Sequence, residues 1–208
     1  MARRTRSVRS LRTVAAVTGA AFAGMLLAGC GGGSSPAPTP PKPTPLASYD
    51  GTVAHVQRVS FCTRIPKDAV ADAVGTSKVT TAHYGNGERL PGTEDLSHEY
   101  GCVFADSDVI ARSWVFVPPV TPARAAQLVT SARKTPGCHT TPAAKFGSPA
   151  IGTVCSSGAI RTVTYRGLFG DAWLACSIAA PTKEASEAEL VARAGIWCVR
   201  VATTASSS

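Results

Sequence analysis

The chain of 208 residues lacks the common motifs of metal sites and of several enzyme classes. No cysteines are spaced as C-x-x-C, which excludes the usual structural zinc pattern. There is no H-E-x-x-H spacing among the four histidines and no G-x-S-x-G nucleophile elbow. These histidines are His55, His83, His98 and His139. The sequence therefore predicts no catalytic residue, no metal and no cofactor.

Acidic residues are missing from the first 49 positions, and no apolar run there is long enough to cross a bilayer. Five arginines precede an apolar stretch from Val14 to Ala28: Arg3, Arg4, Arg6, Arg9 and Arg12. A positive segment before a short apolar run is typical of a secretory signal. A spanning helix needs about 20 apolar residues. We therefore expect residues 1–29 to be a signal peptide.

The apolar stretch ends in Leu27-Ala28-Gly29-Cys30, which resembles the bacterial lipobox. This resemblance implies cleavage before Cys30, diacylation of its thiol and acylation of the new amine. Each buried CH₂ of such lipid contributes about 0.8 kcal/mol, so the chains would hold the protein on the extracytoplasmic face of the cell membrane. The alternative is an uncleaved helical anchor, and Arg3-Arg4 leaves twin-arginine export open as a route.

Glycine, serine and proline dominate the segment after Cys30, which reads GGGSSPAPTPPKPTP from Gly31 to Pro45. Such a composition predicts an extended tether without a core. We expect Cys30 and the tether over residues 30–52, one domain over residues 53–202 and a disordered tail over 203–208. Removing the five signal-peptide arginines lowers the formal charge from +8 to +3. A nucleic-acid partner is therefore not indicated.

Six cysteines remain once Cys30 is set apart: Cys62, Cys102, Cys138, Cys155, Cys176 and Cys198. An even number in an exported domain favours disulfides. Sequence alone cannot choose among the possible pairings, but proximity along the chain favours sequential ones. These are Cys62–Cys102, Cys138–Cys155 and Cys176–Cys198, each worth about 3–4 kcal/mol in the chain-entropy model.

Periodicity and capping residues predict an α+β fold, with a mainly antiparallel sheet, two or three helices packed on it and three disulfides. Pro66 and Gly75 bound a short first helix, and Thr121 with Pro122 begins a second. A last helix is expected over 183–201, with a possible capping box of Ser186 and Glu189 inside it. The predicted strands cover 78–84, 100–104, 109–117, 152–155, 160–169 and 172–179.

Candidate binding residues lie on the predicted strands: Arg112, Trp114, Arg161, Arg166 and Trp173. Strand arginines can face a groove that takes an anionic wall polymer or a lipid head group. The alternative is that exposed arginines protect strand edges from pairing.

Two acidic groups allow weaker functional interpretations. His98-Glu99, near Glu94 and Asp95, could position a general base, although a solvated loop is the simpler interpretation. Asp106 and Asp108 supply too few oxygens for Ca²⁺ and favour a turn.

Several landmarks together resemble actinobacterial secreted lipoproteins grouped as a domain of unknown function. They are Cys62 before a helix closing in Val74-Gly75, Cys102 in a later strand, the Thr-Pro-capped helix, the segment Phe146-Gly147-Ser148-Pro149-Ala150-Ile151-Gly152, and Cys155. Such proteins resemble PsbP-type folds and the extracellular sensor domains of some receptor kinases. The resemblance implies a non-catalytic envelope module that binds or senses a protein, wall or lipid ligand. An exported hydrolase-type enzyme and a structural or secretion-accessory protein remain the alternatives.

Overall fold

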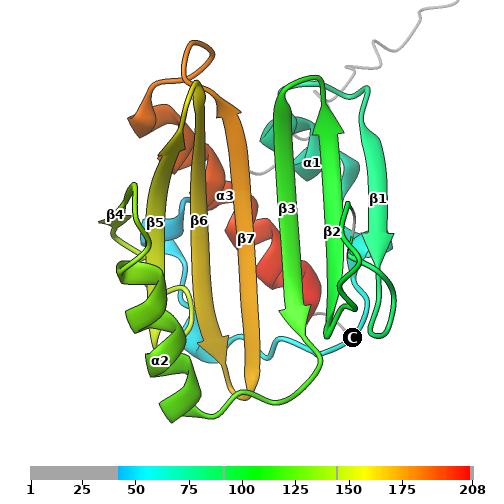
Figure 1. The fold of residues 1–208 in the computed structure, drawn as a ribbon, viewed down its shortest axis with the longest axis vertical. Coiled ribbons are helices and arrows are strands. Elements are labelled where there is room, and N and C mark those ends of the chain that lie inside the picture. The colour runs from blue at the N-terminus through cyan, green and yellow to red at the C-terminus, as the bar shows by residue number, and fades with distance from the viewer. Residues whose placement is uncertain (1–41, 91, 144, 207–208) are drawn as a thin grey trace, which may run out of the picture. The chain divides into compact units, whose positions relative to one another are not determined.

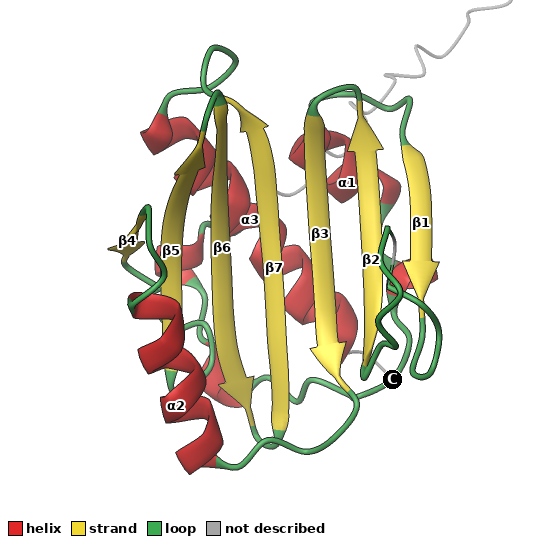
Figure 2. Cartoon of the chain, viewed as in Figure 1, coloured by secondary structure: helices red, strands yellow, loops and turns green. Residues whose placement is uncertain are grey.

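The computed structural model describes residues 42–90, 92–143 and 145–206. The predicted signal peptide, Cys30 and the tether as far as residue 41 lie outside these residues. The described part contains an antiparallel sheet and helices on both of its faces (Figures 1 and 2). The α+β prediction is confirmed.

The sheet has seven strands within the described residues, in the order β1-β2-β3-β7-β6-β5-β4, and every neighbouring pair is antiparallel. Its strands are β1 (Thr80–Tyr84), β2 (Glu99–Asp106), β3 (Val109–Phe116), β4 (Cys138–Thr141), β5 (Ala150–Ser157), β6 (Ile160–Phe169) and β7 (Ala172–Pro181). Strand β7 lies between β3 and β6, so the last strand of the run β1–β3 pairs with the last strand of the run β4–β7 at the centre of the sheet.

Helices α1 (Lys67–Val74) and α3 (Glu187–Ser206) cover one side of the sheet, here called the back face. Figure 1 views the sheet from the opposite side, here called the open face, with α1 and α3 behind the strands. Helix α2 (Pro122–Arg133) lies on the open face at the end of β5 and β6, where Ala125 packs with Leu168 and Trp173. No other helix of the described residues lies over the open face.

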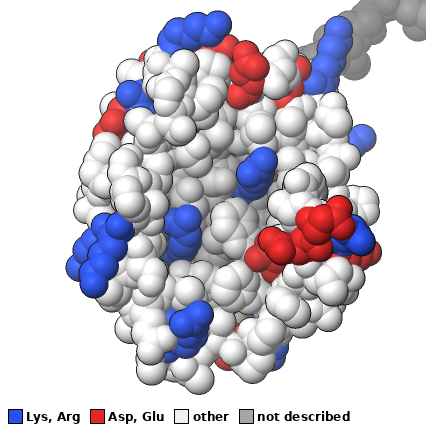
Figure 3. Space-filling view, viewed as in Figure 1, with Lys and Arg blue, Asp and Glu red and all other residues white. Residues whose placement is uncertain are grey.

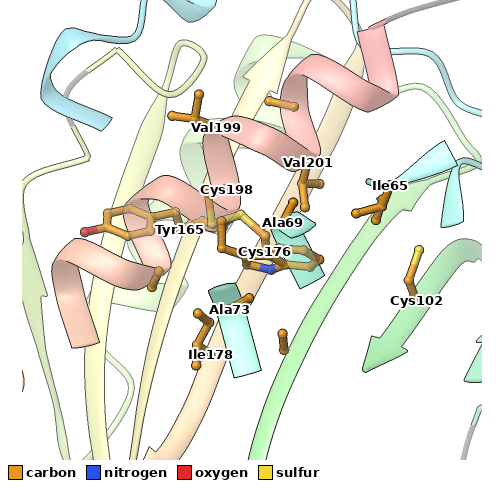
Figure 4. Packing of buried hydrophobic residues seen from close by; sticks show 14 of the residues in the cluster. Ile65, Ala69, Ala73, Cys102, Tyr165, Cys176, Ile178, Cys198, Val199 and Val201 are labelled. Atoms are coloured by element: carbon orange, nitrogen blue, oxygen red, sulfur yellow. Dashed lines mark hydrogen bonds between the residues drawn. A yellow bond between two sulfur atoms is a disulfide. The ribbon is translucent and has the colours of Figure 1, made fainter. Parts of the chain in front are cut away.

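The main core lies between the back face and α3. Leu174 and Ile178 of β7 are fully buried there. Trp197 of α3 is 1% exposed and packs edge-on against Phe104 at a centroid distance of 5.8 Å. Figure 4 shows Cys198 and Val201 of α3 pointing toward the strand that carries Cys176 and Ile178. Burying such side chains contributes about 1.5–3 kcal/mol each.

The three predicted disulfides are present with sequential pairing: Cys62–Cys102, Cys138–Cys155 and Cys176–Cys198. Two of them belong to the back face, where Cys102, Ser113 and Cys176 lie side by side across β2, β3 and β7. Those two connect the sheet to the segment before α1 and to α3. The third joins the edge strand β4 to β5.

The predicted domain limits at residues 53 and 202 are wrong. The segment assigned to the tether contains two short 3₁₀ turns, Leu46–Ser48 and Gly51–Val53, and a third turn spans Cys62–Arg64. Leu46 is 8% exposed and contacts Gly195 of α3, because glycine leaves room for it. Burial of Leu46 and the ion pair of Asp50 with Lys145 at 3.1 Å thus hold a segment whose composition indicated a tether.

The predicted disordered tail is also wrong over residues 203–206, which continue α3. Ala205 is fully buried, and its carbonyl accepts a hydrogen bond from the Gln57 amide at 2.9 Å. The tail looks polar by composition, but small alanine and threonine side chains pack well on a helix face. Residues 207–208 lie outside the described part.

Some element boundaries also differ. Ser186 and Glu189 form the predicted capping box, with bonds of 2.9 Å and 3.3 Å, but at the start of α3 rather than inside it. Strand β4 was not predicted. Strand β5 runs through Ser157, where a turn was expected.

Candidate functional site

The open face carries an unusual set of side chains for the middle of a sheet. One row across β3, β7, β6 and β5 consists of Arg112, Ser177, Thr164 and Thr153. The next row consists of Trp114, Ala175, Arg166 and Ile151. Hydroxyls and small side chains thus form the floor, and two arginines and a tryptophan project from it.

A hollow of about 440 Å³ lies on this face over β1, β2, β3, β7 and β6. It is lined by Ala82, Tyr84, Leu90, Thr93, Glu99, Val103, Arg112, Trp114, Thr162, Thr164 and Ser177. Leu90 and Thr93 belong to the loop between β1 and β2, which forms one wall. In Figure 3 this face is hollowed at its centre, basic side chains stand singly within it, and acidic side chains gather over the loop.

The Arg112 side chain is exposed and makes no hydrogen bond or ion pair within the described residues, while its backbone carbonyl accepts from Trp197 Nε1 at 3.1 Å. Other cations of the described part do have carboxylate partners, such as Arg58 with Asp171 at 3.0 Å. A guanidinium offers five donors in a planar arrangement that suits carboxylate and phosphate groups. Arg112 therefore has its whole donor set available to an anion.

Arg166 is the second cation of this face. Its Nη1 donates to Thr153 Oγ1 at 3.1 Å, and no carboxylate of the described residues lies within ion-pair distance. Burial lowers the pKa of Arg166, because desolvation disfavours the charged form. An anion bound beside it would offset that cost.

Tyr84 and Glu99 form a hydrogen-bonded pair at the loop side of the hollow. Tyr84 Oη donates to Glu99 Oε1 at 2.7 Å. Burial raises the pKa of Glu99, and the bond from Tyr84 partly opposes this. The pKa of Tyr84 is raised first by burial and then by Glu99. The ring of Tyr84 occupies the space where Gly101 would carry a Cβ, so glycine is required there.

The structure separates the five residues that the sequence suggested for a groove. Arg112 and Trp114 line the hollow together, and Arg166 shares their face. Arg161 lies on the back face, where it bonds the Ala185 carbonyl at 3.4 Å and pairs with Glu187 at 3.6 Å. Trp173 is 2% exposed beneath α2. The prediction that Arg161 and Trp173 face the same groove is therefore wrong.

The structure does not bring His98 and Glu99 together as a general base and its positioning group. The Glu99 carboxyl bonds Tyr84, whereas His98 is exposed and does not line the hollow. Glu94 pairs with Arg89 in the loop. Asp106 and Asp108 flank the β2–β3 turn as predicted, with Ser107 at a φ of 49°.

Two kinds of feature are absent from the described part, a cluster of metal-ligating side chains and a membrane-spanning helix. Across residues 42–90, 92–143 and 145–206, no three His, Cys, Asp or Glu side chains gather in a way that suits a metal ion. In the same residues, every helix is too short or too polar to cross a membrane.

Several residues of the hollow were not singled out from the sequence, among them Tyr84, Thr162, Thr164 and Ser177. One signal was available for the threonines, because Thr162, Thr164 and Arg166 alternate with apolar residues along the sequence of β6. Tyr84 carried no comparable signal, because its place beside Glu99 depends on how β1 pairs with β2.

Comparison with known proteins gave no family for this chain. No protein-family model matches the sequence, and no curated protein matches it significantly.

Proposed function

We propose that the chain is a cell-envelope lipoprotein, anchored to the membrane through Cys30, whose domain is a non-catalytic binding or sensing module. The hollow of the open face is its ligand site, and the ligand is a component of the cell wall. The observation that carries the proposal is Arg112, an unpartnered cation beside Trp114 on a face that α1 and α3 leave uncovered.

Three features support this proposal. The lipobox-like Leu27-Ala28-Gly29-Cys30 supports a membrane anchor. The three disulfides suit an oxidising compartment outside the cytoplasm. The resemblance to secreted lipoproteins and receptor sensor domains supports a role in binding or sensing.

The anchor is tested by expressing the wild-type chain and Cys30→Ser in a bacterium with lipoprotein-processing enzymes. We expect the wild type to incorporate a labelled palmitate analogue and to sediment with membranes. Cys30→Ser should be unlabelled and should migrate as the larger precursor, because the signal is no longer cut before residue 30. An unlabelled wild type that migrates at the same size as Cys30→Ser would instead indicate an uncleaved apolar anchor.

The binding site is tested by cosedimentation of the detergent-solubilised protein with purified cell walls. We expect Trp114→Ala to reduce binding by about tenfold, which corresponds to about 1.4 kcal/mol. Val53→Ala is the control, because Val53 is 75% exposed and does not line the hollow. Wall binding unaffected by Trp114→Ala, or no wall binding at all, would contradict the proposal.

A further inference from the structure

The spacing of the two open-face arginines suggests what kind of ligand fits. Arg112 aligns with Ser177 and Thr164 across the sheet, and Arg166 lies two residues beyond Thr164 on β6. With strands about 4.8 Å apart and a rise of about 3.4 Å per residue, their Cα atoms lie about 12 Å apart on a diagonal. Two anionic groups of one extended ligand can therefore be held at once.

The floor between the two arginines allows a ligand to lie close to the sheet. Ala175 and Ser177 occupy β7, the strand between β3 and β6, and both have short side chains. Thr164 and Ser177 are 5% and 6% exposed, so their hydroxyls belong to the floor rather than to its rim. Such a surface offers hydrogen bonds along its length and does not obstruct a flat ligand.

The remaining lining favours a saccharide. Trp114 and Tyr84 provide aromatic surfaces at one end of the hollow, and Thr93, Thr162 and Thr164 provide hydroxyls around it. Aromatic side chains pack against apolar faces of a ligand while polar groups fix its orientation. An acyl chain would leave the hydroxyls of the lining and the Arg112 guanidinium without hydrogen-bond partners, whereas a saccharide supplies them.

The acidic groups near the hollow do not neutralise the arginines. Glu99 bonds Tyr84, Glu88 accepts the Gly85 amide at 2.8 Å, and Glu94 pairs with Arg89. None of these carboxylates lies within ion-pair distance of Arg112 or Arg166. The two arginines therefore have no carboxylate partner among the described residues and can attract an anion from outside the chain.

We propose that the open face binds an acidic saccharide chain, with one anionic group on Arg112, a second on Arg166 and a sugar ring against Trp114. This inference rests on the proposed function, because it names the ligand class of the same hollow. Repeating acidic sugars of the cell wall have the required chemistry, with carboxylates at regular intervals along a hydroxyl-rich chain.

A matched pair of probes tests the inference. The acidic probe is a tetrasaccharide of alternating N-acetylglucosamine and N-acetylmuramic acid, and the neutral probe is a tetrasaccharide of N-acetylglucosamine alone. The two differ in the lactyl carboxylates. The detergent-solubilised protein is titrated with each probe by calorimetry, with tryptophan fluorescence as a second readout.

We expect the acidic probe to bind at least about tenfold more tightly than the neutral one, since charge-assisted pairs with arginine are the stronger hydrogen bonds. Arg112→Ala and Arg166→Ala should each weaken the acidic probe by about tenfold and leave the neutral probe unchanged. Arg112→Lys should restore part of the affinity, because it keeps the charge but not the planar donor set. Lys67→Ala on α1 is the charge-matched control and should have no effect.

Circular dichroism and thermal melting establish that each variant is folded. If Arg166→Ala does not fold, the variants of the exposed Arg112 still decide the test. Equal affinity for both probes, no binding of either, or acidic binding that survives Arg112→Ala would overturn the inference. If neither probe binds while Trp114→Ala still reduces wall binding, the proposed function stands and only the saccharide assignment falls. If Trp114→Ala leaves wall binding unchanged, the proposed function itself falls.

Discussion

The two faces of the same sheet differ sharply in chemistry. On the back face, Val163, Leu174 and Ile178 are fully buried against helices. On the open face, the residues next to them along β6 and β7 are Thr162, Thr164, Ala175 and Ser177. Since strand residues alternate between faces, one stretch of sequence carries both sets. The back face holds the fold together, whereas the open face is the one that we propose for ligand binding.

The disulfides follow the same division. Cys102 and Cys176 lie on the back face and are at most 1% exposed. Cys138 and Cys155 are half-buried at the β4 edge. The first kind holds helices and turns onto the sheet, and the second kind joins two neighbouring strands near the open face.

The largest expected effect comes from truncating a back-face residue. Leu174→Ala should lower the free energy of unfolding by about 2–5 kcal/mol, because it leaves a cavity in a packed core. Arg112→Ala on the open face should change it by less than about 0.5 kcal/mol. Chemical denaturation measures both. Equal destabilisation by the two variants would mean that the faces do not divide the roles of stability and binding.

The disulfides give the next prediction. Under native conditions and mild reductant, Cys138 and Cys155 should be reduced and alkylated before the other four, because reagents reach half-buried sulfurs first. The bond closes a separation of 17 residues, so its loss should cost about 3 kcal/mol in the chain-entropy model. Mass spectrometry of alkylated peptides follows the order. Earlier alkylation of Cys176 or Cys198 would indicate that the back face opens more readily than described.

A smaller effect is expected at the start of α3, which covers the back face. Ser186→Ala removes the capping hydroxyl that accepts from the Glu189 amide at 3.3 Å. The free energy of unfolding should fall by about 1 kcal/mol. Thermal or denaturant unfolding measures it, with Thr182→Ala as the control outside the capping box. An unchanged free energy of unfolding in Ser186→Ala would contradict the stabilising role of this capping box.

The smallest effect concerns pH and belongs to the open face. The pKa of Glu99 is raised by burial, so the folded state favours its protonated form. The stability that protonated Glu99 contributes is fully present below the pKa of a glutamate in the unfolded chain. It is lost as the pH rises through the higher pKa of Glu99 in the folded chain. Glu99→Gln should flatten the pH dependence above about pH 4. Denaturation at several pH values checks this, and an unchanged slope in the variant would contradict it.

Much of the fold could be predicted from local patterns. Thr121 and Pro122 begin α2, and Gly75 ends α1 in the left-handed conformation at a φ of 86°. Along β7, Leu174, Cys176 and Ile178 alternate with Ala175 and Ser177, and this alternation matches the two faces of the strand. The ends of the domain were mispredicted because burial of Leu46 and Ala205 depends on distant parts of α3 and of the preceding segment.

The site was only partly predictable. Arg112 and Trp114 share a strand, so alternation alone places them on one face. Their meeting with Tyr84 and Ser177 depends on strand order, which joins β3 to β7 rather than to the next strand along the chain. Alternation along β7 places Trp173 on the open face together with Ala175 and Ser177. Helix α2 covers Trp173 there, and this packing could not be predicted from strand periodicity.

The central claim, that the uncovered face beside Trp114 attracts anions, is tested most directly by fluorescence quenching with iodide and with caesium. Trp173 and Trp197 are 2% and 1% exposed, so Trp114 is the tryptophan that a quencher reaches within the described residues. The account predicts stronger quenching by iodide than by caesium at equal ionic strength, and a loss of that difference in Arg112→Ala. Equal or stronger quenching by caesium in the wild type would contradict it.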